Sequence, residues 1–269
     1  MSSNSSLHTA TAEDSVWVSI RETANEQVQK EPILASFLHT IILNHDCLED
    51  AVSFHLAERL HSSTLSEMPL REIVDHALSQ DTQIGKSIRA DITAVKERDP
   101  AVCSYLVPLL YMKGLHALIG YRVAHWLWKE DRRFLAIHLQ SRISEVLGVD
   151  IHPAARIGKG VLIDHSTSVV IGETAVVEDN VSMLHEVTLG GTGKDSGDRH
   201  PKVRQNVLIG AGAKILGNLE IGEGAKIGAG SVVLTDVPAH STYAGVPAVL
   251  VGRPQSAEPA LEMNQSFDI

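Results

Sequence analysis

The chain has 269 residues, of which 43% are hydrophobic, and a formal net charge of −10 at pH 7. This composition predicts a globular protein with a substantial core, in one large domain or two ordinary ones, and excludes a largely disordered chain. The acidic balance argues against a general nucleic-acid binder, which needs a basic face for phosphates. No apolar run approaches the ~18 residues of a membrane span.

The cysteines and the first residues indicate the compartment. Cys47 and Cys103 are too few for a disulfide framework and suggest reduced thiols. The N-terminal residues lack the basic start and the apolar run of a signal peptide. We therefore expect a cytoplasmic protein with neither a nucleic-acid nor a membrane partner.

The first half of the chain has the apolar spacing of α-helices. From about Asp14 to Leu147, apolar residues recur every three or four positions. One such series is Leu115, Ile119, Val123 and Leu127. Asp99-Pro100 suits a helix boundary, because the residue before a proline is pushed out of helical geometry. The sequence thus predicts an all-α N-terminal domain over residues 1–147.

The second half repeats every six residues. One run of aliphatic residues at this step is Val203, Ile209, Ile215, Ile221, Ile227 and Val233. Glycine often follows the aliphatic residue directly. The period fits short strands joined by tight corners, with three strands in each coil and the aliphatic side chains pointing inward. Hairpins would instead show alternation and varied turns. We therefore predict an α+β protein whose residues 148–253 form a parallel β-helix.

A short interruption of the repeat contains an acid and a histidine. The step from Ile163 to Ile171 is eight residues and includes Asp164 and His165. Asp150 precedes His165 by nearly one coil, so the two can lie on adjacent layers near one corner. An aspartate that orients a histidine gives a general base for an alcohol substrate. From spacing alone, a structural His–Asp contact is the alternative.

A longer interruption spans residues 190–202 and forms a glycine-rich, cationic loop. A Walker phosphate loop is excluded, because Thr188 stands where glycine is required and Asp195 where Ser or Thr is required. Arg199 beside His200 suits a carboxylate, since a guanidinium offers a planar fork of donors. A solvated loop with incidental charges is the alternative.

Several longer motifs lie between Asp99 and Arg253. They include Lys113-Gly-Leu-His-Ala117, Val149-Asp-Ile-His-Pro-Ala154, Asp164-His-Ser-Thr167, Ile171-Gly-Glu-Thr-Ala175, Gly197-Asp-Arg-His-Pro-Lys202 and Ala244-Gly-Val-Pro-Ala248. Together they closely resemble the motifs of serine O-acetyltransferases, within the hexapeptide-repeat acyltransferases. The helical half also resembles the N-terminal domain of that family. The resemblance implies a left-handed β-helix and transfer of acetyl from acetyl-CoA to L-serine in cysteine biosynthesis, with no metal.

The resemblance also implies roles for individual residues. His165 deprotonates serine with Asp150 as its partner, and the serine oxygen attacks the thioester directly. The serine-binding residues, cationic for the carboxylate and anionic for the ammonium group, are Arg199, His200, Asp99 and Asp164. Acetyl-CoA lies in a groove between neighbouring subunits, where small residues allow close approach. The candidates for this groove are Gly191, Thr192, Ala211 and Ala229, although the alanines also suit corners for their size alone.

The expected partners likewise follow from the resemblance. They are a homotrimer formed by the β-helices, a hexamer formed by pairing of two trimers, L-cysteine as a feedback inhibitor, and O-acetylserine sulfhydrylase. The sulfhydrylase would capture the C-terminal tail, whose terminal Ile269 carboxylate suits a pocket of backbone donors. We expect the polar residues 254–269 to form a flexible tail. A frayed end without a role is the alternative.

Three other functions stay open on the sequence. Transferases that acetylate sugars, aminoglycosides or chloramphenicol-like acceptors share the coils but do not need an amino-acid clamp. A zinc enzyme of the γ-carbonic anhydrase type would use three histidines, here His165, His185 and His200. A non-enzymatic scaffold for the sulfhydrylase is the third function, and it can coexist with catalysis.

Overall fold

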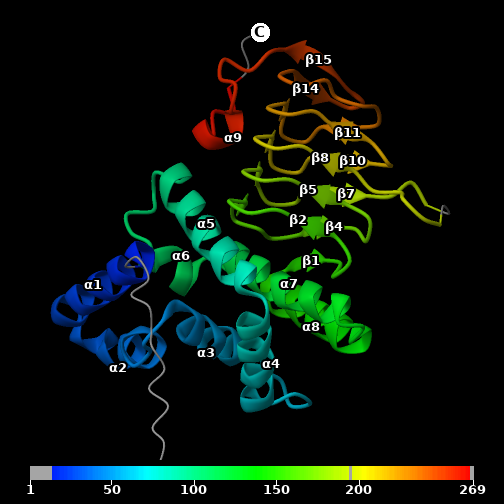
Figure 1. Cartoon of the computed structure of the whole chain (residues 1–269). Helices are drawn as coiled ribbons and strands as arrows, with labels where there is room; N and C mark the ends of the chain where they lie inside the picture. Colours follow the sequence, from blue (N-terminus) through cyan, green and yellow to red (C-terminus); the bar gives the residue numbers. More distant parts are fainter. Residues whose placement is uncertain (1–13, 194–195, 267–269) are drawn as a thin grey trace, which may run out of the picture.

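The computed structural model of the chain describes residues 14–193 and 196–266. Figure 1 shows a group of helices with a stack of short strands built onto it. The predicted fold class is confirmed: an all-α N-terminal part is followed by a parallel β-helix. Within the described part of the chain, none of the helices has the length and apolar character needed to cross a bilayer.

Helices occupy the chain as far as Leu147. They are α1 (Ser15–Lys30), η1 (Pro32–Leu34), α2 (Ala35–Leu38), η2 (His39–Leu43), α3 (Leu48–Leu60), α4 (Glu67–Gln80), α5 (Thr82–Arg98), α6 (Leu106–Tyr111), α7 (Lys113–Lys129) and α8 (Arg133–Leu147). The side chain of Asp14 caps α1 by accepting a hydrogen bond from the backbone N–H of Trp17 at 3.2 Å. α5 ends at Arg98, directly before the predicted boundary at Asp99-Pro100.

The strands form the three faces of a prism. Sheet A contains β1 (Val149–Ile151), β4 (Val169–Ile171), β7 (Thr188–Gly190), β10 (Lys214–Leu216) and β13 (Val232–Val233). Sheet B contains β2 (Arg156–Ile157), β5 (Val176–Val177), β8 (Lys202–Val203) and β11 (Glu220–Ile221). Sheet C contains β3 (Leu162–Ile163), β6 (Ser182–Met183), β9 (Leu208–Ile209), β12 (Lys226–Ile227), β14 (Thr242–Gly245) and β15 (Ala248–Gly252). Only the β14–β15 pair is antiparallel among the strand pairs described.

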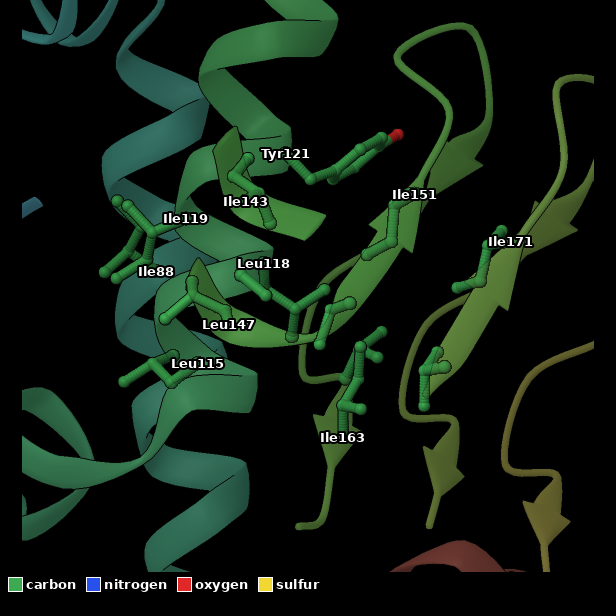
Figure 2. Packing of buried hydrophobic residues seen from close by; sticks show 14 of the residues in the cluster. Ile88, Leu115, Leu118, Ile119, Tyr121, Ile143, Leu147, Ile151, Ile163 and Ile171 are labelled. Atoms are coloured by element: carbon green, nitrogen blue, oxygen red, sulfur yellow. The ribbon is translucent and has the colours of Figure 1, made fainter. Parts of the chain in front are cut away.

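The six-residue step gives each coil its buried column. In sheet A, Ile151 pairs with Ile171, and Ile171 pairs in turn with Leu189, so one aliphatic residue stacks on the next. All three are buried. Figure 2 shows Ile151, Ile163 and Ile171 in the packed interior beside Leu118 and Leu147 of the helices. The apolar core of the prism therefore continues into the helical part without a break.

The helix α7 lies against the first coils. Tyr121 donates a hydrogen bond from its hydroxyl to the carbonyl of Ala155 at 2.5 Å and accepts one from the N–H of Ile157 at 3.2 Å. At the start of α7, a Cβ on Gly114 would lie 2.1 Å from the carbonyl oxygen of Ile163. Only glycine permits this approach, so the helix braces the chain directly before His165.

The C-terminal segment packs against the β-helix over the part that the structure describes. Its described part, residues 254–266, lies on the outer face of sheet C and includes the short helix α9 (Pro259–Glu262), visible beside the upper coils in Figure 1. Ala260 is fully buried, and its carbonyl accepts a hydrogen bond from Ser182 at 2.8 Å. Lys226 donates to the carbonyl of Ser266. The segment packs because Leu208 of β9 and Leu184, the residue after β6, offer apolar side chains to cover.

Candidate active site

The predicted site residues gather at two different edges of sheet A. The chain passes from sheet C to sheet A through residues 164–168, 184–187, 210–213 and 228–231, which we call the histidine corner. It passes from sheet A to sheet B at what we call the arginine corner, whose described residues are 152–155, 172–175, 191–193, 196–201 and 217–219. The two corners lie at opposite ends of the sheet A strands, so the length of those strands separates them.

His165 stands at the histidine corner with its side chain 73% exposed. Its Nε2 lies 3.6 Å from the carboxylate of Asp164, within ion-pair range if the imidazole is protonated. One coil above, the ring of His185 meets it edge to face, with the ring centroids 5.8 Å apart. The exposed imidazole is therefore accessible to a ligand and has a carboxylate at its side.

The backbone around His165 is strained. His165, Ser166 and Ser168 all adopt left-handed conformations, with φ between 55° and 63°. Such angles are costly for residues other than glycine and persist where the surroundings enforce them. Here the brace at Gly114 and a hydrogen bond from Lys113 to Thr167 hold the turn. The two extra residues in this step of the repeat thus form a rigid projection that presents the imidazole.

Asp150 lies in the middle of β1, where its side chain faces outward because its neighbours Val149 and Ile151 point into the core. Its carboxylate accepts a hydrogen bond from the side chain of Gln140 at 2.6 Å. Among the described residues, no hydrogen bond or ion pair joins it to His165. The predicted dyad is therefore not assembled within one chain.

The arginine corner holds an ordered cationic pair. Arg199 forms an ion pair with Glu173 at 2.6 Å, and the hydrogen bond from Arg199 lowers the pKa of that carboxyl. His200 is 7% exposed, and its Nδ1 lies 2.9 Å from the hydroxyl of Thr174. Burial, together with the nearby Arg199, lowers the pKa of His200. The two predicted carboxylate-binding residues are thus held side by side, and His200 is kept neutral near pH 7.

Asp99 caps the end of α5 and accepts a hydrogen bond from the N–H of Ala101 at 2.9 Å. The preceding residue, Arg98, is buried and donates to Ser182 on the outer face of sheet C at 3.0 Å. This contact ties the end of α5 to the sheet that leads into the histidine corner. Asp164, the other carboxylate expected at the ammonium group, directly precedes His165 at the histidine corner.

The candidate acetyl-CoA residues also divide between the corners. Ala211 and Ala229 stack at the histidine corner above His165, where the N–H of Gly230 donates to the carbonyl of Ala211 at 2.7 Å. Gly191 and Thr192 begin the long loop at the arginine corner. Ile269 lies outside the described residues.

The three histidines of the zinc alternative do not converge in one chain, because His165 and His185 occupy one corner and His200 the other. Over residues 14–193 and 196–266, no group of three His, Cys, Asp or Glu side chains is placed to hold a metal ion. Cys47 and Cys103 are free thiols.

Sequence reasoning assigned no role to Glu173 and Thr174, which hold Arg199 and His200. The six-residue repeat does indicate where these two residues lie. Both residues follow the inward Ile171 within the arginine corner, in the motif Ile171-Gly-Glu-Thr-Ala175, one coil below the long loop. Their position relative to the inward-facing aliphatic residue of their coil predicts that they lie beneath the cationic pair.

Comparison with known proteins gives consistent relatives. Residues 16–119 match the family model described as serine acetyltransferase, N-terminal, and residues 200–235 match that of bacterial transferase hexapeptide repeats. The serine acetyltransferase of Salmonella typhimurium is 55% identical over 253 residues, which are 94% of this chain and 93% of the relative.

Two related structures were solved as complexes with small molecules. A serine acetyltransferase in complex with cysteine superposes with a TM-score of 0.92 at 53% identity, over 94% of this chain and 98% of the other. A serine acetyltransferase from Brucella abortus in complex with coenzyme A has a TM-score of 0.88 at 54% identity, over 89% and 96% of the two chains.

Proposed function

The chain belongs to the serine acetyltransferase family of acetyl-CoA-dependent acyltransferases, and on this basis we propose that it acetylates the hydroxyl of L-serine by general-base catalysis at His165. The products are O-acetyl-L-serine and CoA, and the reaction serves cysteine biosynthesis. The relatives that bind cysteine and coenzyme A support both the amino-acid acceptor and the thioester donor.

In the proposed reaction, His165 takes the proton of the serine hydroxyl as the oxygen attacks the thioester carbonyl. The tetrahedral intermediate collapses with loss of the CoA thiolate, and the imidazolium returns its proton to that sulfur. A base is needed because an alkyl hydroxyl is a very weak acid near neutral pH. The exposure of His165 and the carboxylate of Asp164 at 3.6 Å support this role, since the carboxylate stabilises the imidazolium.

We further propose that two chains complete each site. The acceptor is a zwitterion, so it needs a cationic group at one end and an anionic group at the other. Arg199 and His200 bind the carboxylate, whereas Asp164 and Asp99 receive the ammonium group. The rigid, filled prism keeps the arginine corner away from His165 of the same chain. A second copy that brings its arginine corner against the histidine corner supplies the missing half, and repetition of this contact closes a ring.

The same contact gives Asp150 its proposed role. Asp150 faces outward on sheet A, between the two corners, with its carboxylate half-buried. It therefore lies on the surface that a neighbouring copy covers, where it can steady the imidazole as the partner of His165. In the isolated chain it is held by Gln140 at 2.6 Å instead.

The remaining assignments extend this arrangement. Acetyl-CoA lies in the groove between copies, along Ala211 and Ala229 of one corner and Gly191 and Thr192 of the other. The β-helices form a trimer and the helical parts pair two trimers into a hexamer. L-Cysteine, which differs from serine by one atom, inhibits at the acceptor site. The end of the chain at Ile269 binds O-acetylserine sulfhydrylase, and the enzyme acts in the cytoplasm.

The observation that carries the proposal is the pair of corners, one with an exposed imidazole and one with an ordered Arg–His clamp. Its test is the rate of CoA-thiol release from acetyl-CoA with L-serine, compared with sugar, aminoglycoside and chloramphenicol acceptors. We expect turnover with L-serine only. Equal or faster turnover with a non-amino-acid acceptor would contradict the clamp, and dependence on added zinc after chelation would favour metal chemistry.

A mixing experiment tests the shared site. Chains carrying His165→Ala and chains carrying Arg199→Ala are each inactive at low serine, and they are unfolded and refolded together in equal amounts. About a quarter of the wild-type activity should return, because a quarter of the randomly formed interfaces then combine an intact His165 with an intact Arg199. A double variant refolded with itself is the control. No recovery in the mixture would place both residues in one chain's site.

A further inference from the structure

Thr174 makes an unusually complete set of hydrogen bonds at the arginine corner. Its hydroxyl oxygen accepts from the backbone N–H of Arg199 at 3.0 Å and from that of His200 at 3.1 Å. A hydroxyl has two acceptor lone pairs and one proton. Both lone pairs are used, so the proton is left for the two acceptors beside it, which are His200 Nδ1 at 2.9 Å and the carboxylate of Asp198.

The backbone of Thr174 also donates a hydrogen bond to this imidazole. Its N–H points at His200 Nδ1 over 3.2 Å. A backbone N–H can only donate, so this hydrogen bond is made only while Nδ1 carries no proton. A neutral imidazole has its proton on one nitrogen, and here that nitrogen is Nε2. Two donors from one residue thus both stabilise the Nε2–H tautomer of His200, and loss of one of them weakens that preference.

The surroundings keep the imidazole in that neutral form. His200 is almost fully buried, and both burial and the adjacent Arg199 lower its pKa. Protonation would also place an N–H on Nδ1 directly against the N–H of Thr174. Near neutral pH, His200 therefore presents one N–H donor at Nε2 and no net charge.

The ring is placed by two glycines. A Cβ on Gly172 would lie 2.0 Å from Nε2 of His200, so the imidazole edge rests directly on that backbone. A Cβ on Gly191 would lie 3.5 Å from the same atom. In the described ranges, no hydrogen-bond acceptor is recorded for this Nε2, although the atoms around Nδ1 are fully paired. The donor is left for a ligand.

We propose that Thr174 is a positioning residue, which fixes His200 as the Nε2–H tautomer so that it donates a hydrogen bond to the carboxylate of the acyl acceptor. The inference rests on the proposed function, in which His200 and Arg199 bind that carboxylate. Glu173 orients Arg199 at 2.6 Å, and Thr174 orients His200. Two adjacent residues on one coil thus support two adjacent residues on the next.

The kinetic test compares Thr174→Val, which keeps the side-chain shape and loses the hydroxyl, with Thr174→Ser, which keeps the hydroxyl. We expect Thr174→Val to raise the serine KM and the cysteine inhibition constant together by about tenfold, with a smaller change in kcat and in the KM for acetyl-CoA. Thr174→Ser should restore both constants to near the wild-type values. Thr242→Val, at a buried threonine on β14, is the matched control and should leave them unchanged.

A spectroscopic readout separates positioning from mere packing. In the ¹⁵N spectrum of histidine-labelled protein, His200 is identified by the signal lost in His200→Gln. The wild type and Thr174→Ser should show the Nε2–H tautomer, and Thr174→Val should show a population with the proton on Nδ1. An unchanged tautomer in Thr174→Val, or a serine KM that Thr174→Ser does not restore, overturns the proposal.

The two proposals fail in different ways. If His200→Ala leaves the serine KM unchanged, the carboxylate clamp is wrong, whatever tautomer His200 adopts. If His200→Ala raises the serine KM but Thr174→Val changes neither that constant nor the tautomer, the clamp stands and the role of Thr174 is wrong. Thermal unfolding of each variant shows whether a lost activity reflects a lost fold.

Discussion

Asp91 on α5 and Arg122 on α7 form a buried ion pair at the base of the β-helix. Arg122 donates to one carboxylate oxygen of Asp91 at 2.6 and 3.0 Å, and the other oxygen accepts from the N–H of Val161 at 3.0 Å. Arg122 also donates to the carbonyl of Gly158 at 2.7 Å. The pair thus joins two helices to the first coil, and both carboxylate oxygens of Asp91 accept hydrogen bonds.

Removal of one member of this pair should be strongly destabilising. Asp91→Ala leaves a buried guanidinium without its counter-charge, which costs about 3–5 kcal/mol of unfolding free energy. The measurement is urea denaturation followed by circular dichroism. Asp75→Ala, which breaks the exposed pair of Asp75 with Arg71, is the control and should cost less than about 1 kcal/mol. Equal effects of the two substitutions would contradict the structural role.

Loss of the proposed base should affect turnover rather than binding. His165→Ala should lower kcat by about 10³-fold, because general-base catalysis contributes two to four orders of magnitude. The KM for acetyl-CoA should change little, since the proposed contact of the imidazole is with the acceptor hydroxyl. Steady-state thiol release measures both constants. His61→Ala, at an exposed histidine of the helical part, is the control. A near-normal kcat would remove His165 from the reaction.

Loss of the proposed clamp should do the reverse. Arg199→Ala should raise the serine KM by about tenfold to a hundredfold, the range expected for a hydrogen bond to a charged group. Inhibition by cysteine should weaken by a similar factor, because both amino acids present the same carboxylate. The measurement is initial rate against serine at several cysteine concentrations. If only one of the two constants changes, serine and cysteine do not share this contact.

Two buried histidines should make stability depend on pH. His55 and His116 meet edge to face in the helical part with ring centroids 5.0 Å apart, and burial lowers their pKa values to about 4 and about 3. The unfolded chain takes up their protons near pH 6.5, whereas the folded chain does not. Stability should therefore be complete above pH 6.5 and fall as the pH drops toward 4.

The loss for His55 alone is about 3 kcal/mol between pH 7 and pH 4, by linkage. Urea denaturation at a series of pH values measures it, and His55→Leu should flatten the curve. His61→Leu is the exposed control. A curve that stays equally steep in His55→Leu would assign the pH dependence to other groups.

The end of the chain should be dispensable for catalysis. Deletion of Ile269 should abolish binding to O-acetylserine sulfhydrylase and leave acetyl transfer intact, because the proposed capture depends on the terminal carboxylate. Calorimetry of the two proteins and the thiol-release assay give the two readouts. Substitution of Asn264 by Ala, upstream of the terminus, is the control. Unchanged sulfhydrylase binding in the deletion would discard this role.

Much of the fold follows from local rules that the sequence displays. The proline after Asp99 predicted the end of α5, and the six-residue step predicted coils, because each reflects a steric or packing demand on neighbouring residues. The docking of residues 254–266 did not follow. Ala260 is buried because the segment packs on sheet C, and the polar residues around it have no apolar periodicity. The local sequence therefore does not predict this contact.

The sequence proposes members for the candidate site but not their grouping. The interruptions of the repeat pointed to His165 and to Arg199, and both stand at corners. The two residues lie at opposite ends of the sheet A strands. The spacing of the repeat does not show this, because it does not say how many residues belong to each strand and how many to each corner. The outward direction of Asp150 was implicit in Val149 and Ile151, whereas its hydrogen bond to Gln140 joins two elements that only the folded chain brings together.

The stacking of the coils fixes the distances between residues at the histidine corner. His165, His185, Ala211 and Ala229 occupy successive coils, and neighbouring strands are about 4.8 Å apart, so roughly 14 Å separates the first from the last. This length is fixed by backbone hydrogen bonds rather than by side chains. Excision of a single coil would bring Ala229 about 4.8 Å nearer to His165, so the proposed acetyl-CoA contacts would no longer match the length of the thioester.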